Sequence, residues 1–371
     1  MQFYETYSSN SIAGTANQCF TTSAADSAQT GRMFYKIANG GEYEYALAFS
    51  NIVASTYAQG EISRANRVCD EWEILSMRVG RCDKNAFGSD VEENGTYAEK
   101  AYDFRDITFG GKAQKTVMPG EFYSTDPFIM AFEKDEYLCL EVTFKGKMIP
   151  YHPEVQIPVY RKTESGWSFN KEMPPADMIG VKRAVKTRVA FLGDSITQGI
   201  GPDLNSYEHW NAFLSEMLGG EYAFWNLGIG YGRAADIATD GAWLFKAKQN
   251  DFVVLCAGVN DILHTKDLTP QQLIASLETT VSALKAAGCR VFLQTMPPFD
   301  YIEEQRIKWE AVNAYIKMEM IRQVEGVFDV VPVIGLKEAP HMAKYGGHPD
   351  SEGCLAWAKA LYPAVKAALE H

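Results

Sequence analysis

The hydrophobic positions follow two different patterns along the chain. Up to about residue 160 they lie in short alternating or aromatic runs, such as EYEYALAFSN, DEWEILSMRV and YLCLEVTFKG. Turns rich in Gly, Asn and Asp separate these runs, and amphipathic helices are scarce. Many short strands with turns of this kind are typical of a β-sandwich. We therefore predict an all-β domain over residues 1–160.

From residue 187 onward the pattern changes. The apolar runs RVAFLG, AFWNLG, FVVLCAG, RVFLQT and VFDVVPV predict strands, and helical stretches such as TPQQLIASLETTVSALKAAG separate them. Strands that alternate with helices predict a parallel sheet covered on both faces, so residues 187–371 are expected to form an α/β domain. Residues 161–186 are expected to form a linker, because Pro174 and Pro175 interrupt regular structure.

Size and composition agree with two globular domains. The chain has 371 residues, of which 46% are hydrophobic. Its net charge of −12 argues against nucleic acid or an anionic membrane as partner, since both require a basic surface. No run of about eighteen apolar residues predicts a membrane span, and the N-terminus lacks the features of a secretory signal.

Cysteine and histidine usage indicates neither disulfides nor a metal site. The seven cysteines are scattered without CxxC spacing, which suits reduced thiols and predicts a cytoplasmic location; a secreted protein whose signal peptide has been removed is the alternative. His209, His264 and His341 share no metal-ligand spacing, so no metal is expected.

Chemistry is expected beyond the carboxyl ends of the parallel strands, where ligands bind in such sheets. There the sequence RVAFLGDSITQG places Ser195 between a strand and a helix. A serine at this position can attack an acyl carbon, and its backbone N–H can stabilise the resulting oxyanion. The alternative is that Ser195 only caps the helix. The GxSxG nucleophile motif of αβ-hydrolases is absent, because position 197 is Thr.

Two further strand ends carry possible oxyanion donors. In WNLGIGYGRA, Gly228 lets the backbone approach a ligand closely, although a plain glycine turn explains the sequence equally well. In LCAGVNDI, the side-chain amide of Asn260 can donate to the same oxyanion, or it can cap a loop. His348, in YGGHPDSEG before the last predicted helix, is a candidate base; a histidine before proline is otherwise often a surface residue.

Taken in order, GDS, NxG, GxND and HP resemble the SGNH (GDSL-type) hydrolases over residues of about 187–370. The resemblance implies a flavodoxin-like, three-layer α/β/α domain without metal or organic cofactor. It implies that Ser195 is the nucleophile and His348 the general base. By the same resemblance, Ser195, Gly228 and Asn260 form the oxyanion hole.

The N-terminal half carries a second resemblance. The segment ITFGGKAQKTVMPGEFYSTDPFIM, with YLCLEVTF after it, is similar to the β-sandwich that precedes the catalytic domain in some bacterial SGNH esterases. Several of those esterases are grouped with acetylxylan-type carbohydrate esterases. A jelly-roll domain before an SGNH domain is also the arrangement of carbohydrate esterase family two. This resemblance implies acetyl esters of plant-derived oligosaccharides as substrates.

The family pattern DxxH is broken, because Tyr345 stands where the acid is expected. Loss of that acid costs a serine protease about 10⁴ in kcat. A backbone carbonyl near Gly346 and Gly347 can hold the imidazole in a Ser-His dyad, which is the interpretation we favour. Alternatively Asp350, Glu352 or a more distant acid reaches the ring, or the site is inactive.

The sequence thus predicts a serine esterase that removes short acyl groups, most notably acetyl, from small-molecule or oligosaccharide esters. A lipase, lysophospholipase or thioesterase shares the same motifs. A carbohydrate-binding protein with a silenced hydrolase domain is the non-enzymatic alternative.

Overall fold

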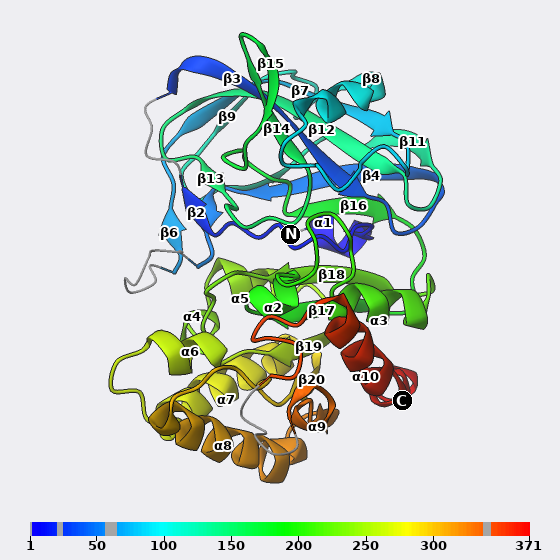
Figure 1. Ribbon diagram of the computed structural model, residues 1–371. Coiled ribbons are helices and arrows are strands. Elements are labelled where there is room, and N and C mark those ends of the chain that lie inside the picture. Colours follow the sequence, from blue (N-terminus) through cyan, green and yellow to red (C-terminus); the bar gives the residue numbers. More distant parts are fainter. Residues whose placement is uncertain (1, 21–24, 56–64, 337–342) are drawn as a thin grey trace. The chain divides into compact units, whose positions relative to one another are not determined.

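The computed structural model describes residues 2–20, 25–55, 65–336 and 343–371 (Figure 1). The chain divides into two compact units. The first consists of Met1–Val53 and Arg67–Ala184, and the second of Ala54–Asn66 and Val185–His371. A short segment between two strands of the first unit therefore belongs to the second.

The first unit contains two antiparallel sheets, as expected for a β-sandwich. One has the order β1-β16-β4-β10, with β11 also on β4; the other has the order β15-β14-β3-β12-β7-β8, with β9 also on β7. Two short pairs, β2 with β13 and β5 with β6, accompany them. The elements are α1 (Gln2–Thr6), β1 (Ser8–Ser9), β2 (Cys19–Phe20), β3 (Ala25–Lys36), β4 (Gly41–Ser50), β5 (Ile52–Val53), β6 (Arg67–Val68), β7 (Trp72–Cys82), η1 (Gly95–Lys100), β8 (Tyr102–Ile107), β9 (Lys115–Val117), β10 (Phe122–Ser124), β11 (Phe128–Phe132), β12 (Tyr137–Gly146), β13 (Pro150–Tyr151), β14 (Val159–Thr163), β15 (Gly166–Phe169) and β16 (Met178–Lys182).

The expected linker over residues 161–186 is folded instead. It contains the end of β14 and all of β15 and β16, and each of these strands pairs within the first unit. Pro174 and Pro175 lie between β15 and β16, so they separate two strands rather than two domains. Met178 to Val181 are buried, because β16 lies in the sheet between β1 and β4.

The second unit is built on a parallel sheet with the order β18-β17-β19-β20-β21, which confirms the α/β prediction. The strands β17, β18 and β19 are almost fully buried, as expected for a sheet covered on both faces. The elements are β17 (Arg188–Gly193), α2 (Ser195–Gln198), α3 (Trp210–Leu218), β18 (Ala223–Gly228), α4 (Ala234–Ile237), α5 (Ala242–Ala247), β19 (Phe252–Cys256), α6 (Val259–His264), α7 (Pro270–Ala286), β20 (Arg290–Gln294), α8 (Glu303–Met318), η2 (Met320–Arg322), β21 (Gly326–Phe328), α9 (Val331–Ile334) and α10 (Ser351–Glu370).

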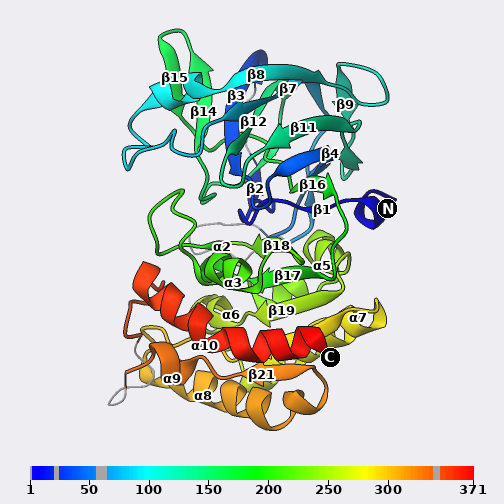
Figure 2. The same cartoon turned by 90° about the vertical axis from the view of Figure 1, so that its right-hand side faces the viewer.

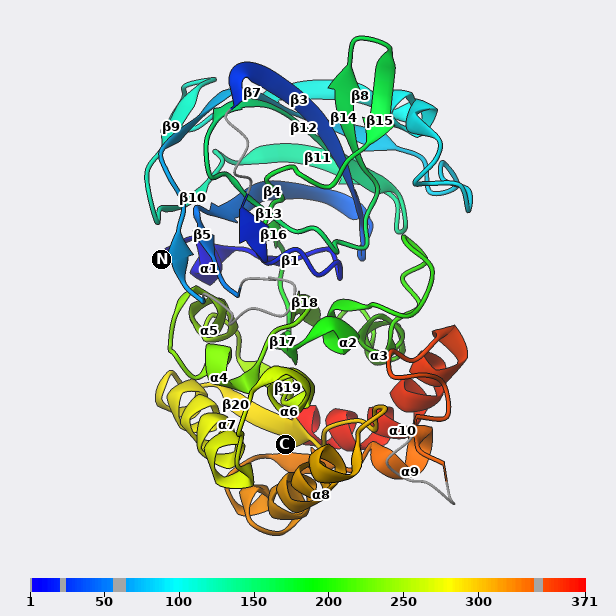
Figure 3. The same cartoon turned by 60° about the vertical axis from the view of Figure 1, so that its left-hand side comes forward.

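Helices cover both faces of this sheet. On one face α3 packs on α10 (Figure 2). At this contact the indole rings of Trp210 and Trp357 stack with their centroids 5.2 Å apart. On the other face α7 contacts α4, α5 and α8 (Figure 3). Right-handed crossovers between the parallel strands place the helices in this way. Among the described residues, no helix combines the length and the apolarity that crossing a bilayer requires.

The strand order reverses once, next to β17. The chain passes from β17 to β18 on one side and then returns to β19 on the other. In open α/β sheets the crevice at such a reversal, beyond the carboxyl ends of the strands, is the usual ligand site. Ser195 follows β17 and Asn260 follows β19, so both lie at this edge of the sheet.

Candidate active site

The turn from β17 into α2 presents Ser195. A Cβ on Gly193 would lie 2.2 Å from Thr197 Oγ1, so only glycine permits so tight a turn. The carboxylate of Asp194 accepts a hydrogen bond from the backbone N–H of Ile196 at 3.0 Å and caps the short helix. Burial raises the pKa of Asp194 to about 7. Ser195 is therefore the first residue of α2, where helical geometry provides no acceptor for its backbone N–H.

The side chains of Ser195 and His348 meet across this edge of the sheet. Ser195 Oγ lies 2.8 Å from His348 Nε2, within hydrogen-bond distance. Burial lowers the pKa of the imidazole below its usual value of 6.5, so the ring is neutral at pH 7 and can accept the hydroxyl proton. The two residues are 153 positions apart in the chain, and the fold alone brings them together.

No acid supports His348 in the part of the chain that the structure describes, where its ring makes one hydrogen bond, to Ser195. Asp350 is the N-cap of α10, and its carboxylate accepts from the Gly353 N–H at 2.9 Å. Glu352 is exposed on the first turn of the same helix. Asp350 thus serves the helix rather than the imidazole.

An aromatic ring packs against His348 instead. The ring of Phe299 stands at 83° to the imidazole, with 5.6 Å between centroids, and comes from the loop after β20. A Cβ on Gly347 would lie 2.7 Å from Phe299 Cε2, so this glycine makes room for the ring. Phe299 was not identified from the sequence. The one indication of its presence in the sequence was Gly347, the glycine that leaves space for the ring. The favoured backbone acceptor for His348 is not seen within the described residues.

Gly228 has a packing role. Its N–H donates to Asn226 Oδ1 at 2.9 Å, so this donor has a partner within the strand end. A Cβ on Gly228 would lie 2.0 Å from the backbone nitrogen of Gln198, which explains why glycine is required. The left-handed turn of the following loop occurs at Tyr231, whose φ is +58°.

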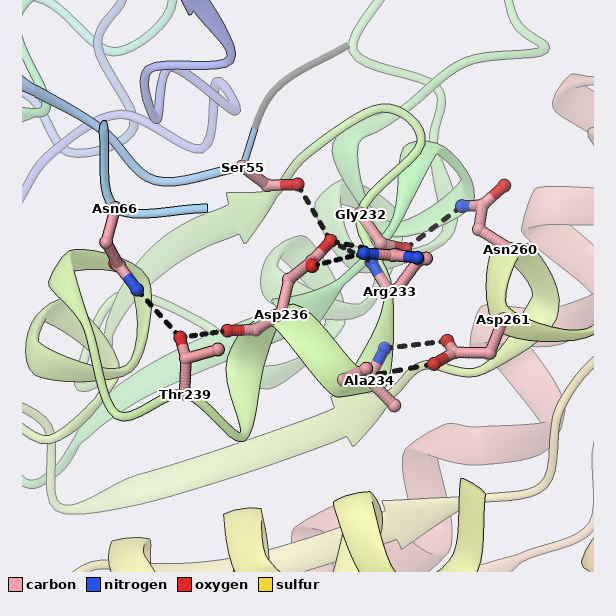
Figure 4. A network of polar contacts seen from close by, with 10 residues as sticks. Ser55, Asn66, Gly232, Arg233, Ala234, Asp236, Thr239, Asn260 and Asp261 are labelled. Atoms are coloured by element: carbon pink, nitrogen blue, oxygen red, sulfur yellow. Dashed lines mark hydrogen bonds and ion pairs between the residues drawn. The ribbon is translucent and has the colours of Figure 1, made fainter. Parts of the chain in front are cut away.

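Asn260 contacts the same loop from the other side. Its Nδ2 donates to the Gly232 carbonyl at 3.0 Å (Figure 4), and a side-chain amide has a second N–H to offer. The neighbouring Asp261 accepts from the N–H groups of Ala234 and Ala235 at 2.7 and 3.1 Å, which ties α4 to α6. Burial raises the pKa of Asp261 to about 6.

Comparison with known proteins agrees with this geometry. Residues 191–354 match the model of the GDSL-like lipase/acylhydrolase family. The chain therefore contains a GDSL-like hydrolase domain. No curated protein matches the chain.

Solved structures similar to the chain include three esterases at low identity. A carbohydrate acetylesterase family member from Sinorhizobium meliloti is 18% identical, with a TM-score of 0.41, and the match covers 50% of this chain and 99% of that one. The psychrotrophic esterase EstA from Pseudoalteromonas sp. is 17% identical, with a TM-score of 0.40 and coverage of 50% and 99%. The aryl esterase of M. smegmatis is 17% identical, with a TM-score of 0.40 and coverage of 49% and 99%.

The loop between Tyr231 and α4 of the GDSL-like domain is held by an ion pair between the partly buried Arg233 and the buried Asp236. Arg233 donates from Nη2 to Asp236 Oδ1 at 2.9 Å and from Nε to Oδ2 at 3.3 Å. Ser55 Oγ donates to Asp236 Oδ2 at 3.1 Å (Figure 4). Arg233 therefore pairs with an acid, and this pair is continuous with the Gly232 carbonyl that Asn260 binds.

A second contact from the same early segment completes the GDSL-like domain. Asn66 Oδ1 accepts from the Ala242 N–H at 2.9 Å, at the start of α5, and Asn66 Nδ2 donates to Thr239 Oγ1 at 2.7 Å. A Cβ on Gly241 would lie 1.6 Å from Asn66 Oδ1. The domain thus takes a helix cap from residues that precede it by more than a hundred positions, which no local sequence signal indicates.

Two of the three histidines considered as metal ligands lie within the described residues. His209 is buried next to Asn211, and its burial lowers its pKa to about 4. His264 lies at the end of α6, and His341 is outside the described residues. The described residues contain no group of three metal-ligating side chains.

Proposed function

We propose that this protein is a serine esterase that hydrolyses short acyl esters, chiefly acetyl esters of plant-derived oligosaccharides. The observation that carries the proposal is the 2.8 Å distance between Ser195 Oγ and His348 Nε2 at the switch point of the parallel sheet. A nucleophile within hydrogen-bond reach of a neutral imidazole is the arrangement that acyl transfer requires.

In the first step His348 removes the proton of Ser195 while Oγ attacks the ester carbonyl. The carbonyl oxygen gains negative charge in the tetrahedral intermediate. The Ser195 N–H and the second amide hydrogen of Asn260 supply donors for that oxygen. His348 then protonates the leaving alkoxide, and an acyl-serine remains.

In the second step water attacks the acyl-serine, with His348 again acting as base. The acid is released when His348 returns the proton to Ser195. These steps use only side chains, backbone groups and water. With no carboxylate on the imidazole, packing against Phe299 would hold the ring, and the transition state would lack a full negative charge on Nδ1.

The substrate class rests on the resemblance of the two-unit arrangement to acetyl-specific carbohydrate esterases. The β-sandwich that precedes the hydrolase domain supports it. The seven cysteines are unpaired, which supports action in a reducing compartment such as the cytoplasm on imported fragments.

Substrate profiling tests the proposal. Purified protein is assayed with acetate, butyrate and decanoate esters and with acetylated xylo- and manno-oligosaccharides, alongside the Ser195→Ala variant. We expect a preference for acetate and acetate release from the oligosaccharides, both lost in Ser195→Ala. A preference for decanoate would favour a lipase or thioesterase, and no turnover above the variant would refute an esterase.

A further inference from the structure

Tyr231 lies in the loop after β18, where its side chain is exposed and its backbone conformation is strained. Its side chain is 38% exposed, and among the described Phe, Tyr and Trp residues of the second unit it alone is exposed. Its φ of +58° lies in the left-handed region, which a bulky side chain rarely adopts. Glycine would fit this turn without strain, and glycines stand on both sides of it. Strain of this kind persists mainly where the side chain has a function.

His264 extends the exposed aromatic surface. Its imidazole lies 5.7 Å from the Tyr231 ring, centroid to centroid, at an angle of 36°. On α6, His264 follows Asn260 by four residues, so both side chains project from the same face of the helix. The ring pair therefore adjoins the amide that contacts the Gly232 carbonyl.

The polar groups around the ring pair are suited to an uncharged ligand. Arg233 pairs with Asp236, and within the described residues its Nη1 makes no hydrogen bond and remains a donor. Partial burial, and after it the Arg233 cation, lower the pKa of His264, so its ring is neutral at pH 7. Figure 4 shows the Arg233 side chain paired with Asp236, and Asn260 bonded to the carbonyl of the preceding residue, Gly232.

We propose that Tyr231 and His264 form a sugar-binding subsite, on which the pyranose ring that carries the ester stacks while Ser195 attacks the acyl group. This inference rests on the proposed esterase function and specifies its substrate recognition. A pyranose ring has a C–H face that packs on an aromatic ring and hydroxyl edges that accept from Arg233. An acyl chain would instead require an enclosed apolar cavity, whereas these rings are exposed to solvent.

The test separates ring stacking from loop structure. Tyr231→Gly removes the ring and also relieves the backbone strain, while Tyr231→Phe keeps the ring. Asp267→Gly is the matched control, because Asp267 also has a left-handed φ, of +55°, and lies in the loop after α6. For each protein kcat/KM is measured with monoacetylated xylobiose and with ethyl acetate, whose leaving group has no ring to stack.

We compare the ratio of kcat/KM for the xylobiose ester to kcat/KM for ethyl acetate. Tyr231→Gly should lower this ratio roughly two- to tenfold, mainly through a higher KM for the sugar ester, and should not lower the melting temperature. Tyr231→Phe and Asp267→Gly should keep the wild-type ratio. An unchanged ratio in Tyr231→Gly overturns the subsite, and so does a selective loss on longer acyl esters, which would assign the rings to the acyl group.

Binding provides a readout that does not depend on turnover. Calorimetry with unacetylated xylotriose is carried out on Ser195→Ala and on Ser195→Ala combined with Tyr231→Gly. Weaker binding in the double variant supports the subsite even if the wild type hydrolyses no ester tested, an outcome that would refute the proposed function alone. Equal binding, or none in either protein, overturns the subsite.

Discussion

The ring of Phe299 stands edge-to-face against the imidazole of His348, with 5.6 Å between their centroids at an angle of 83°. Edge-to-face pairs of this kind contribute about 0.5–1.5 kcal/mol beyond the area they bury. Here the contact limits the rotation of a ring that no carboxylate holds within the described residues. Within the described residues, the His348 ring is thus positioned by packing rather than by charge.

If Phe299 positions His348, Phe299→Leu should lower kcat roughly three- to tenfold with little change in KM, because a smaller side chain leaves the imidazole freer to rotate. Steady-state kinetics with a small acetate ester measure the effects on kcat and on KM separately. Phe299→Tyr, which keeps the ring, should restore kcat. Equal losses in Phe299→Leu and Phe299→Tyr would contradict a positioning role.

Asp350 is expected to matter for stability and not for chemistry. Its carboxylate caps α10, so Asp350→Ala should lower the free energy of unfolding by about 1 kcal/mol, while kcat stays near the wild-type value. Denaturant unfolding and steady-state kinetics test both parts. Asp350→Asn can still cap the helix but cannot act as an acid. A loss of kcat in Asp350→Asn as large as that in Ser195→Ala would make Asp350 the missing acid.

The acidic limb of the pH–rate profile should lie below pH 6.5. In the proposed mechanism His348 acts as a base only when neutral, and its burial lowers its pKa, so the neutral form persists to lower pH than for a free imidazole. The pH dependence of kcat/KM reports this pKa for the free enzyme. A midpoint above 6.5 would indicate a negative charge near the ring, and therefore an acid that supports it.

Asn66 is predicted to stabilise the hydrolase domain across a long sequence separation. Asn66→Gly tolerates the left-handed φ of +62° but removes both hydrogen bonds, so it should lower the free energy of unfolding by about 1–2 kcal/mol. Asn66→Asp retains an acceptor for the Ala242 N–H and should lose less. Unfolding of the full-length variants is the measurement, and wild-type stability in Asn66→Gly would contradict the capping role.

The buried carboxyl of Asp194 should make stability fall as pH rises. Its pKa is about 7 in the folded protein against about 3.9 in an unfolded chain, so the folded state holds the proton more tightly between pH 4 and 7. Its contribution is complete below pH 4 and is lost as pH rises through 7. His209, with a lowered pKa of about 4, acts in the opposite direction between pH 4 and 6.5.

Asp194→Asn isolates this effect, because asparagine can still cap α2 but does not titrate. The free energy of unfolding of the variant, relative to that of the wild type, should rise as pH increases from 4 to 7. The rise should be at most on the order of 3 kcal/mol. Unfolding curves at several pH values measure the difference. A constant difference across this range would show that Asp194 does not titrate there.

The sequence by itself determined the two classes of fold and the order of the catalytic motifs. Strands and helices could be predicted because the periodicity of apolar residues is a local property of each segment. The block GDS was also readable, because a glycine, a capping acid and a serine at a strand end are neighbours in the chain. The absence of an acid at Tyr345 was visible for the same reason.

Only the tertiary structure decided which groups surround those motifs. Phe299 reaches His348, and Asn66 reaches α5, through contacts between distant parts of the chain that no spacing encodes. The Gly228 N–H donates to the Asn226 side chain, and the Asp350 carboxylate accepts from the Gly353 N–H. A donor or acceptor pairs with the partner that packing brings closest. Side-chain orientation follows from packing, and packing is a property of the whole fold.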